Sequence, residues 1–333
     1  MFQSVRSLVR RQFTAVVVMM LAVVTGCKKE EPPKVEAVDT GPVSVKLQLN
    51  WKPEPQFGGF FAAQEIGAYA QNGLIVNVRP GGASAPTVDM LGAGTVEFAI
   101  VSADEVIRSR SNGNRIVALF AAYQTNPQGI MTRASRGFTD ISEIFRAPGT
   151  LAMEKGLPYA QYLQKKYGFD KLKLVPSPFG DLSMYRSTEN YAMQCFVTSE
   201  PLAAAKTGIE PKAFLIADSG YNPYTTVLAT SDDYLTKHPK VVADMTAAVR
   251  AGWLDYSADA EKTNAVMQKL NPTMDAATFT ASAAAQKPLM EVGSTPVGSM
   301  TLERWQTLVS QLKDLNAIAN DVDPKTCFVP TNW

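Results

Sequence analysis

The strongest constraint on the fold is an alternation of short apolar strand patterns with helical patterns along residues 43–122. The first strand shows it clearly, because its apolar residues stand at alternate positions: Val43, Val45, Leu47 and Leu49. Alternating strands and helices are typical of an α/β unit with a mainly parallel sheet. The strands of this unit are expected at 43–49, 74–78, 96–101 and 116–122.

A second, smaller α/β unit is predicted from about Gly129, where the pattern restarts. Its strands are expected at 129–132, 149–153, 172–175, 193–197 and 213–217. One more apolar strand, 225–230, is followed by segments that are nearly all helical, at 239–256, 258–270, 275–286 and 301–315. These helices have no sheet of their own to cover, so we expect them to pack on the first unit.

This return makes the chain cross between the units twice, near 123–130 and near 221–230. Two crossing segments create a hinge with a cleft beside it. We therefore predict an α/β fold of two lobes, with two doubly wound sheets joined by the crossing segments. Residues 43–125 and 226–333 are expected to form lobe 1, and residues 126–225 lobe 2.

The N-terminus has the features of an export signal. Residues 1–26 carry three arginines and no acid, and an apolar run at 13–24 is too short for a confident membrane span. The small residues before Cys27 resemble the lipobox of bacterial lipoproteins, which implies cleavage before Cys27 and its acylation. The alternative is an ordinary signal peptide with an incidental cysteine. The charged, proline-bearing stretch 27–42 is expected to be a flexible tether, so the body would lie in the periplasm or at the cell surface, anchored by lipid.

The charge balance does not favour a nucleic-acid partner. The chain has 32 basic and 31 acidic residues, and removing the three arginines of the signal leaves 29 basic against 31 acidic. We identify no metal-ligand spacing, no catalytic motif and no cofactor fingerprint. Beyond Cys27 there are two cysteines, Cys195 and Cys327, which could form one disulfide; we favour two free, buried thiols.

An aromatic turn follows the first strand. Pro53 and Pro55 end the strand, and glycines then open a helix expected at 60–71. Trp51 and Phe57 therefore stand at the carboxyl end of a first strand, where open α/β sheets hold ligands. Both are candidates for ligand contact, with burial in the core as the alternative; Phe60 and Phe61 are expected in the core.

Polar candidates for ligand contact follow other strands or begin helices. Each has a structural alternative, such as helix capping for Ser84 and Glu200, a helix-dipole role for Asp104, or packing on neighbours for the tyrosines. Tyr221 and Tyr224 lie on the second crossing segment. The full set is Ser84, Ser102, Asp104, Glu154, Glu200, Tyr221 and Tyr224.

Several segments together resemble a known family of binding proteins: 49–53 (Leu-Asn-Trp-Lys-Pro), 59–63, 67–69, 73–76 and 94–100. They are similar to periplasmic binding proteins of the alkanesulfonate, nitrate and taurine group, above all to the branch that binds thiamine-pyrimidine precursors and riboflavin. The resemblance implies the type II periplasmic-binding-protein fold and a monomeric lipoprotein that delivers a small solute to an ABC permease.

The resemblance also frames the alternatives. In the family, an acidic or polar residue near Glu200 often reaches the ligand, as a pyrimidine would need. A sulfonate, taurine or nitrate ligand is the alternative within the same clamp, and a sensory role uses the same clamp too. The branch also contains fungal pyrimidine-synthesising enzymes with a cysteine-rich motif and a donor histidine. This chain has only His238, before Pro239, and widely spaced cysteines, so we expect no enzyme.

Overall fold

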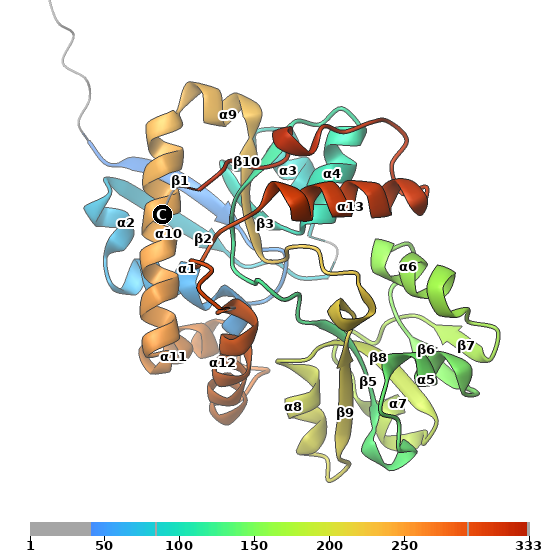
Figure 1. Ribbon diagram of the computed structural model, residues 1–333. Helices are drawn as coiled ribbons and strands as arrows, with labels where there is room; N and C mark the ends of the chain where they lie inside the picture. The colour runs from blue at the N-terminus through green and yellow to red at the C-terminus, as the bar shows by residue number, and fades with distance from the viewer. Residues whose placement is uncertain (1–40, 84, 292, 332–333) are drawn as a thin grey trace, which may run out of the picture. The chain divides into compact units, whose positions relative to one another are not determined.

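The computed structural model describes residues 41–331 except 84 and 292, and residues 41–333 form one compact unit. The strands form two five-stranded mixed sheets (Figure 1), as the predicted two-lobed α/β fold requires. The first sheet has the order β2-β1-β3-β10-β4, and β10 is antiparallel to both neighbours. Its strands are β1 (Val43–Gln48), β2 (Leu74–Arg79), β3 (Phe98–Val101), β4 (Ile116–Ala121) and β10 (Val227–Ser231).

The second sheet has the order β7-β6-β8-β5-β9, and here β5 is the antiparallel strand. In each sheet the antiparallel strand is therefore the one that the chain enters directly after crossing from the other sheet: β10 in the first and β5 in the second. The strands are β5 (Gln128–Arg133), β6 (Gly149–Ala152), β7 (Leu172–Val175), β8 (Tyr191–Phe196) and β9 (Pro211–Leu215). We call the first sheet with its helices lobe 1 and the second sheet with its helices lobe 2.

Helices cover both faces of the first sheet. Phe98 and Ile100 on β3 share a core with α1 and α10, whereas the intervening Ala99 and Val101 share a core with α3, α4 and α13. The helices of lobe 1 are α1 (Gly58–Glu65), α2 (Ala68–Gln71), α3 (Thr87–Gly92), α4 (Ala103–Ser111), α9 (Asp232–Lys237), α10 (Pro239–Ala258), α11 (Glu261–Leu270), α12 (Ala276–Met290) and α13 (Leu302–Asp314). Those of lobe 2 are α5 (Ile141–Arg146), α6 (Pro158–Tyr167), α7 (Ser183–Ser187) and α8 (Glu200–Ala205).

The prediction of one continuous helix at 60–71 is wrong, because the structure has two helices there, α1 and α2. Gly67 between them has φ 73°, a left-handed conformation that glycine adopts without steric cost. The core assignment of Phe60 and Phe61 is confirmed, since they are 0% and 4% exposed. The sequence analysis missed the short helices α5 and α9.

The C-terminal helices pack on lobe 1, as predicted. Helix α10 lies directly against α1 (Figure 1), and Trp253 meets Phe60 edge to face with ring centroids 5.7 Å apart. Glycines let the two helix backbones come this close. A Cβ atom on Gly252 would lie 2.1 Å from the carbonyl oxygen of Gly59 and 2.5 Å from the nitrogen of Ala63.

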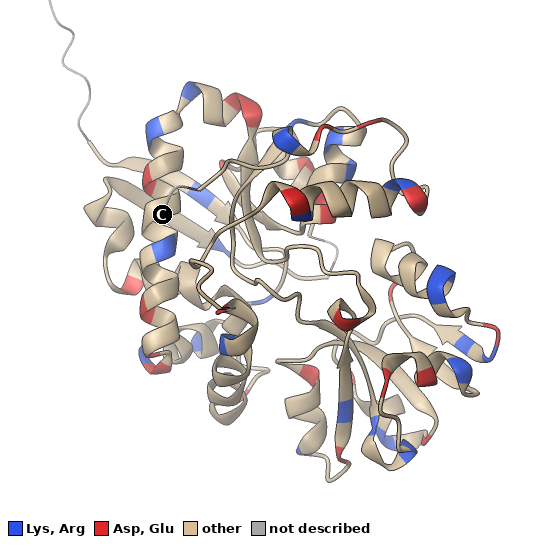
Figure 2. Cartoon of the chain, in the orientation of Figure 1, with Lys and Arg blue, Asp and Glu red and all other residues tan. Residues whose placement is uncertain are grey.

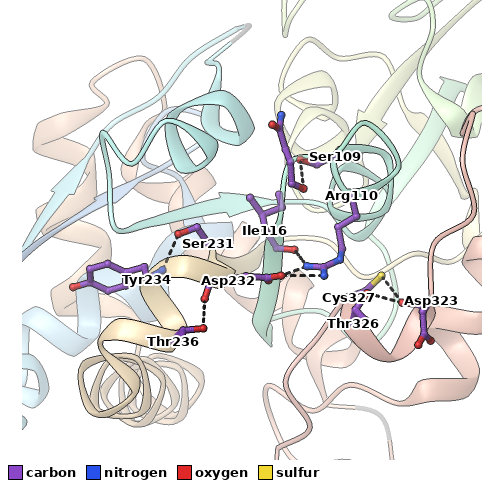
Figure 3. Close-up of polar contacts among 11 residues, drawn as sticks. Ser109, Arg110, Ile116, Ser231, Asp232, Tyr234, Thr236, Asp323, Thr326 and Cys327 are labelled. Carbon is purple, nitrogen blue, oxygen red and sulfur yellow. Dashed lines mark hydrogen bonds and ion pairs between the residues drawn. The ribbon is translucent and has the colours of Figure 1, made fainter.

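An ion pair joins α4 to the start of α9 at the edge of the first sheet. The guanidinium of Arg110 donates two hydrogen bonds, of 2.9 and 3.0 Å, to the two carboxylate oxygens of Asp232 (Figure 3). It also donates to the carbonyl oxygen of Ile116 at 2.8 Å. Since this geometry uses both oxygens of Asp232, it fixes the angle at which α9 leaves β10.

Two crossing segments, 122–127 and 216–226, connect the sheets, and a polar network holds them together. The amide nitrogen of Asn126 donates to the side-chain oxygen of Asn222 at 2.8 Å. Arg304 on α13 donates to Gln124 on the first segment (2.6 Å) and to Asn222 on the second (2.7 and 2.9 Å). One guanidinium thus ties both crossing segments to lobe 1.

Several expectations concern single residues or the N-terminus. Cys195 and Cys327 are free and buried, which confirms the expectation of two thiols. The predicted signal peptide, Cys27, nearly all of the tether and Ser84 lie outside the described residues. Within the part that the structure describes, no helix has the length and apolar character needed to cross a membrane.

We predict that Gly252→Ala destabilises the protein, because the new methyl group must push α10 away from α1. The expected loss is about 1–3 kcal/mol in the free energy of unfolding, measured by urea denaturation. Gly92→Ala is the matched control: the nearest atom to its added Cβ is 3.6 Å away, on Asn114. Equal stabilities of the two variants would contradict the close-approach argument.

Candidate functional site

A cavity of about 750 Å³ lies between the lobes, within the usual size range of small-molecule sites. Lobe 1 contributes the turn after β1, the loop after β2 and Glu105 on α4, and lobe 2 contributes the start of β5, the end of β8 and residues that follow β6, β7 and β8. Thr225 and Thr226 of the second crossing segment also line the cavity. The side chains on which the argument below depends are Trp51, Glu54, Gln56, Glu105, Glu154, Lys155, Phe179, Gln194 and Glu200.

The turn after β1 is held rigidly. Gly81 donates its amide to the carbonyl oxygen of Trp51 at 3.0 Å, and Asn271 donates its side-chain amide to the carbonyl oxygen of Pro53 at 3.1 Å. A Cβ atom on Gly81 would lie 2.2 Å from the carbonyl oxygen of Leu49, so this contact needs glycine. The indole N–H of Trp51 donates to the carboxylate of Glu54 at 3.2 Å. These bonds orient the Trp51 ring at the cavity wall.

Trp51 faces an aromatic side chain from the other lobe. The rings of Trp51 and Phe179 are stacked, with centroids 6.3 Å apart and planes 28° from parallel. Phe179 lies in the loop after β7, is 49% exposed and has φ 48°, a backbone conformation that is uncommon for a residue other than glycine. An exposed aromatic residue held in an uncommon conformation favours a role in ligand contact.

The cavity lining is acidic, although basic and acidic residues are interspersed over both lobes in the cartoon of Figure 2. Among the described residues that line it, the acidic and basic side chains are one lysine and four glutamates: Lys155, Glu54, Glu105, Glu154 and Glu200. Burial raises the pKa of each of the four carboxyl groups. Partly buried carboxylates in excess favour a ligand that donates hydrogen bonds or carries positive charge.

Glu54 responds strongly to this environment. Burial, and next the charge on Glu200, raise the pKa of Glu54 from 4.5 to about 7, although hydrogen bonds from Trp51 and Gln56 and the charge on Lys52 oppose the shift. Its carboxyl group therefore changes charge near neutral pH.

The second-lobe wall is fixed by hydrogen bonds from neighbouring residues. The backbone N–H of Phe196 donates to the carboxylate of Glu200 at 2.8 Å. The side-chain oxygen of Gln194 accepts two bonds, from the N–H of Glu154 (2.6 Å) and the hydroxyl of Tyr159 (2.8 Å). These bonds hold the side chains of Glu200 and Gln194 at the cavity. Lys206, which follows α8, also pairs with Asp275, which precedes α12, at 2.6 Å, so the lobes touch through an ion pair.

The structure brings four of the candidates into the cavity lining: Trp51, Phe57, Glu154 and Glu200. Phe57 is also 1% exposed and belongs to the core of lobe 1, so both interpretations of it apply. Ser84 lies outside the described residues.

Four candidates lie outside the lining, and their contacts explain why. Ser102 precedes α4, and its hydroxyl donates to Glu105 at 2.9 Å, so Glu105 takes the position in the lining. Asp104 stands beside Arg108. Tyr221 packs on Tyr162, 5.2 Å between centroids, and Tyr224 packs under Arg304 and accepts from the N–H of Thr301. Both tyrosines therefore support the hinge.

Sequence reasoning missed Glu54, Phe179, Gln194 and Glu105 as lining residues. The position of Glu54 between Pro53 and Pro55 in the aromatic turn could have indicated that it lines the cleft. The position of Phe179 in a proline-rich loop after a strand of lobe 2 could have indicated the same. Gln194 lies within β8 and carries no such signal. Among the described residues, no group of three His, Cys, Asp or Glu side chains is arranged to hold a metal ion.

A family model described as "NMT1/THI5 like" matches residues 54–263, well over half of the chain. The chain belongs to this family. A search of curated proteins by sequence gave no match.

Solved structures resemble this NMT1/THI5-like protein in fold. The aliphatic sulphonate binding protein SsuA from Escherichia coli is 12% identical, with a TM-score of 0.66 over 88% of this chain and 94% of that one. The nitrate-binding protein NrtA from Synechocystis is 13% identical, with a TM-score of 0.64 over 86% of each chain. A Candida albicans protein described as having the generic periplasmic binding protein fold is 18% identical, with a TM-score of 0.59 over 87% and 97%. At these identities the likeness establishes the periplasmic-binding-protein fold.

We predict that the stability of the protein falls as pH rises from about 4.5 to 7, in part because of Glu54. Its folded pKa of about 7 exceeds its ordinary 4.5, so in this range the folded state holds a proton that the unfolded state has lost. The destabilisation from this group grows through the range and is complete above about pH 7, on the order of 3 kcal/mol.

Glu54→Gln isolates this contribution, because the amide keeps an acceptor for Trp51 but cannot ionise. The variant should match the wild type near pH 4.5 and exceed it in stability near pH 8, as measured by urea denaturation at both values. Parallel stability curves for the two proteins would show that Glu54 titrates normally.

Proposed function

We propose that this protein is an extracytoplasmic solute-binding protein of an ABC importer and that it captures a small, flat heterocycle between its lobes. The observation that carries the proposal is a cavity with acidic side chains from both lobes and an aromatic pair, Trp51 and Phe179, that spans them. Aromatic faces bind flat rings, and carboxylates accept hydrogen bonds from ring nitrogens and amino groups. Thiamine-pyrimidine precursors and riboflavin fit this description.

A sulfonate- or nitrate-type anion is the second candidate, because two proteins with the same fold are described as binding these anions. Lys155 is the cationic side chain that could serve such a ligand, and it is exposed. Four carboxylates in the same lining would repel an anion, so we favour the heterocycle.

We further propose that Cys27 is the lipid-bearing first residue of the mature protein, that residues 27–42 tether it to a membrane, and that 43–125 with 226–333 and 126–225 are the two lobes. Export and lipid attachment would place the cavity where an ABC permease can receive its solute. The support is the arginine-bearing apolar N-terminus and the small residues before Cys27.

The test of the proposed function is a thermal-shift screen with thiamine, its pyrimidine precursors, riboflavin, taurine, alkanesulfonates and nitrate. A ligand at a hundred times its dissociation constant should stabilise the protein by about 2.7 kcal/mol. We expect the shift with a heterocycle. Shifts with anions alone would overturn the heterocycle in favour of the second candidate, and no shift with any solute would count against a solute-binding role.

With the ligand from that screen, Trp51→Ala should weaken binding at least tenfold, about 1.4 kcal/mol, because it removes one aromatic face. Trp51→Phe is the matched control: it loses the second ring of the indole and the hydrogen bond to Glu54 but keeps an aromatic face, so it should retain more affinity than Trp51→Ala. Binding of Trp51→Ala at wild-type strength would place the ligand elsewhere.

Cys27→Ala should release the protein from the membrane fraction or block its processing, because no thiol remains for acylation. The measurement is fractionation of cells that express either form, with the wild type as control. Unchanged membrane association of the variant would argue against the lipid anchor.

A further inference from the structure

Two helices from different lobes meet at α8 and α12. Helix α8 of lobe 2 begins with Glu200 in the cavity lining and contacts α12 of lobe 1 (Figure 1). The ammonium group of Lys206, directly after α8, donates to both carboxylate oxygens of Asp275, each 2.6 Å away, and to the hydroxyl oxygen of Thr278. One side chain of lobe 2 therefore holds two residues at the start of α12.

The acceptor side of this contact is held in place by lobe 1 alone. Asp275 is the N-cap of α12, and its carboxylate accepts from the backbone N–H of Thr278 at 2.8 Å and from the hydroxyl of Thr278 at 3.1 Å. The hydrogen bond from Lys206, as the first cause, lowers the pKa of Asp275 from 3.8 to about 2, so the carboxylate is charged at neutral pH. Lobe 2 thus pairs with a pre-oriented acceptor, which reduces the entropy lost on pairing.

Helix α12 is also tied to the cavity wall and to the hinge. Just before it, the side-chain amide of Asn271 donates to the carbonyl oxygen of Pro53 at 3.1 Å, in the aromatic turn that lines the cavity. Near its other end, the carbonyl oxygen of Leu289 accepts from the backbone N–H groups of Gln124 (2.9 Å) and Thr125 (2.8 Å) on the first crossing segment. The start of α12 is therefore connected to the parts of lobe 1 that surround the cleft.

The ion pair between the lobes is partly exposed. The side chains of Lys206 and Asp275 are 46% and 60% exposed, so dissolved salt screens their attraction. Pairs with this exposure contribute little to the free energy of unfolding. Between two lobes joined by a hinge, however, a small free energy is enough to change the ratio of open to closed molecules.

We propose that Lys206 and the start of α12 form a latch that holds the lobes closed over the cavity, and that breaking the latch opens the cleft. All its groups belong to this chain, so the latch forms without a solute. Since closed lobes cover the cavity, the latch also slows the departure of a captured solute. In this purpose the inference rests on the proposed function, whereas its test involves no solute.

The test measures the distance between the lobes by pulsed electron paramagnetic resonance. Spin labels are attached to Leu270→Cys in lobe 1 and Met184→Cys in lobe 2, which are 51% and 48% exposed, whereas Cys195 and Cys327 are buried. With the latch intact, the main population should lie at the distance set by the structure. Lys206→Met should raise the ratio of open to closed molecules about threefold or more. Salt at about 0.5 M should have the same effect on the intact latch.

A second variant separates the charge from the helix cap. Asp275→Asn removes the charge and keeps a good N-cap, so it should open the cleft as Lys206→Met does. The two substitutions combined should open it no further than either alone, because both remove the same contact. Lys240→Met is the matched control: Lys240 pairs with Asp244 at the same 2.6 Å, but both lie on α10 in lobe 1, so the distances should not change.

Several results would overturn the latch. These are a wild type whose main population is already open, an unchanged distribution in Lys206→Met, additive effects of the two substitutions, or equal opening in Lys240→Met. The solute screen judges the proposed function separately. Because no distance measurement contains a solute, the latch can fail while solute binding is established, and the reverse.

Discussion

The structure depends on the hydrogen bonds by which β10 completes the first sheet. This strand pairs antiparallel with β3 on one side and β4 on the other. Without it, backbone N–H and C=O groups of both neighbours would be buried without hydrogen-bond partners. Val227, Leu228 and Ala229 are fully buried there. In the chain, β10 follows all the strands of the second sheet. To pair with β3 and β4, the chain must therefore cross back to lobe 1, and the two crossing segments form the hinge.

The hinge in turn determines what the cavity can be. Arg304, Asn126 and Asn222 hold the two crossing segments side by side, so the lobes face one another across a cleft whose walls come from distant parts of the chain. The turns at the carboxyl ends of strands point into that cleft, which is where open α/β sheets place ligands. Trp51 from one lobe and Phe179 from the other stack there, and Glu54 and Glu200 line the same cavity from opposite lobes. The chemistry of the site is therefore a property of lobe closure as much as of any single segment.

Much of the fold could be predicted from local patterns. All ten strands of the structure were expected, because each is a short apolar run between turn residues, and the unpartnered C-terminal helices were expected on lobe 1 for want of another surface. The break between α1 and α2 was missed because Gly67 is tolerated within a helix pattern and only its left-handed backbone reveals the turn. The tyrosines of the second crossing segment, Tyr221 and Tyr224, were candidates for ligand contact by position. In the structure, Arg304 packs on the ring of Tyr224, and Tyr221 packs on Tyr162. These contacts hold both tyrosines within the hinge.

The sequence by itself determined the element types, the two α/β units and the aromatic turn, because strand periodicity, proline and glycine act over a few residues. Only the tertiary structure decided which polar side chains share one cavity. Ser102 was a candidate from its position and Glu105 was not, but in the structure Ser102 donates to Glu105 at the start of α4, and the glutamate is the one in the cavity lining. The approach of Glu54 to Glu200 joins residues nearly 150 positions apart, and no local pattern encodes that distance. It arises from the return of β10 and the meeting of the lobes; burial in the resulting cavity, and next the charge on Glu200, raise the pKa of Glu54.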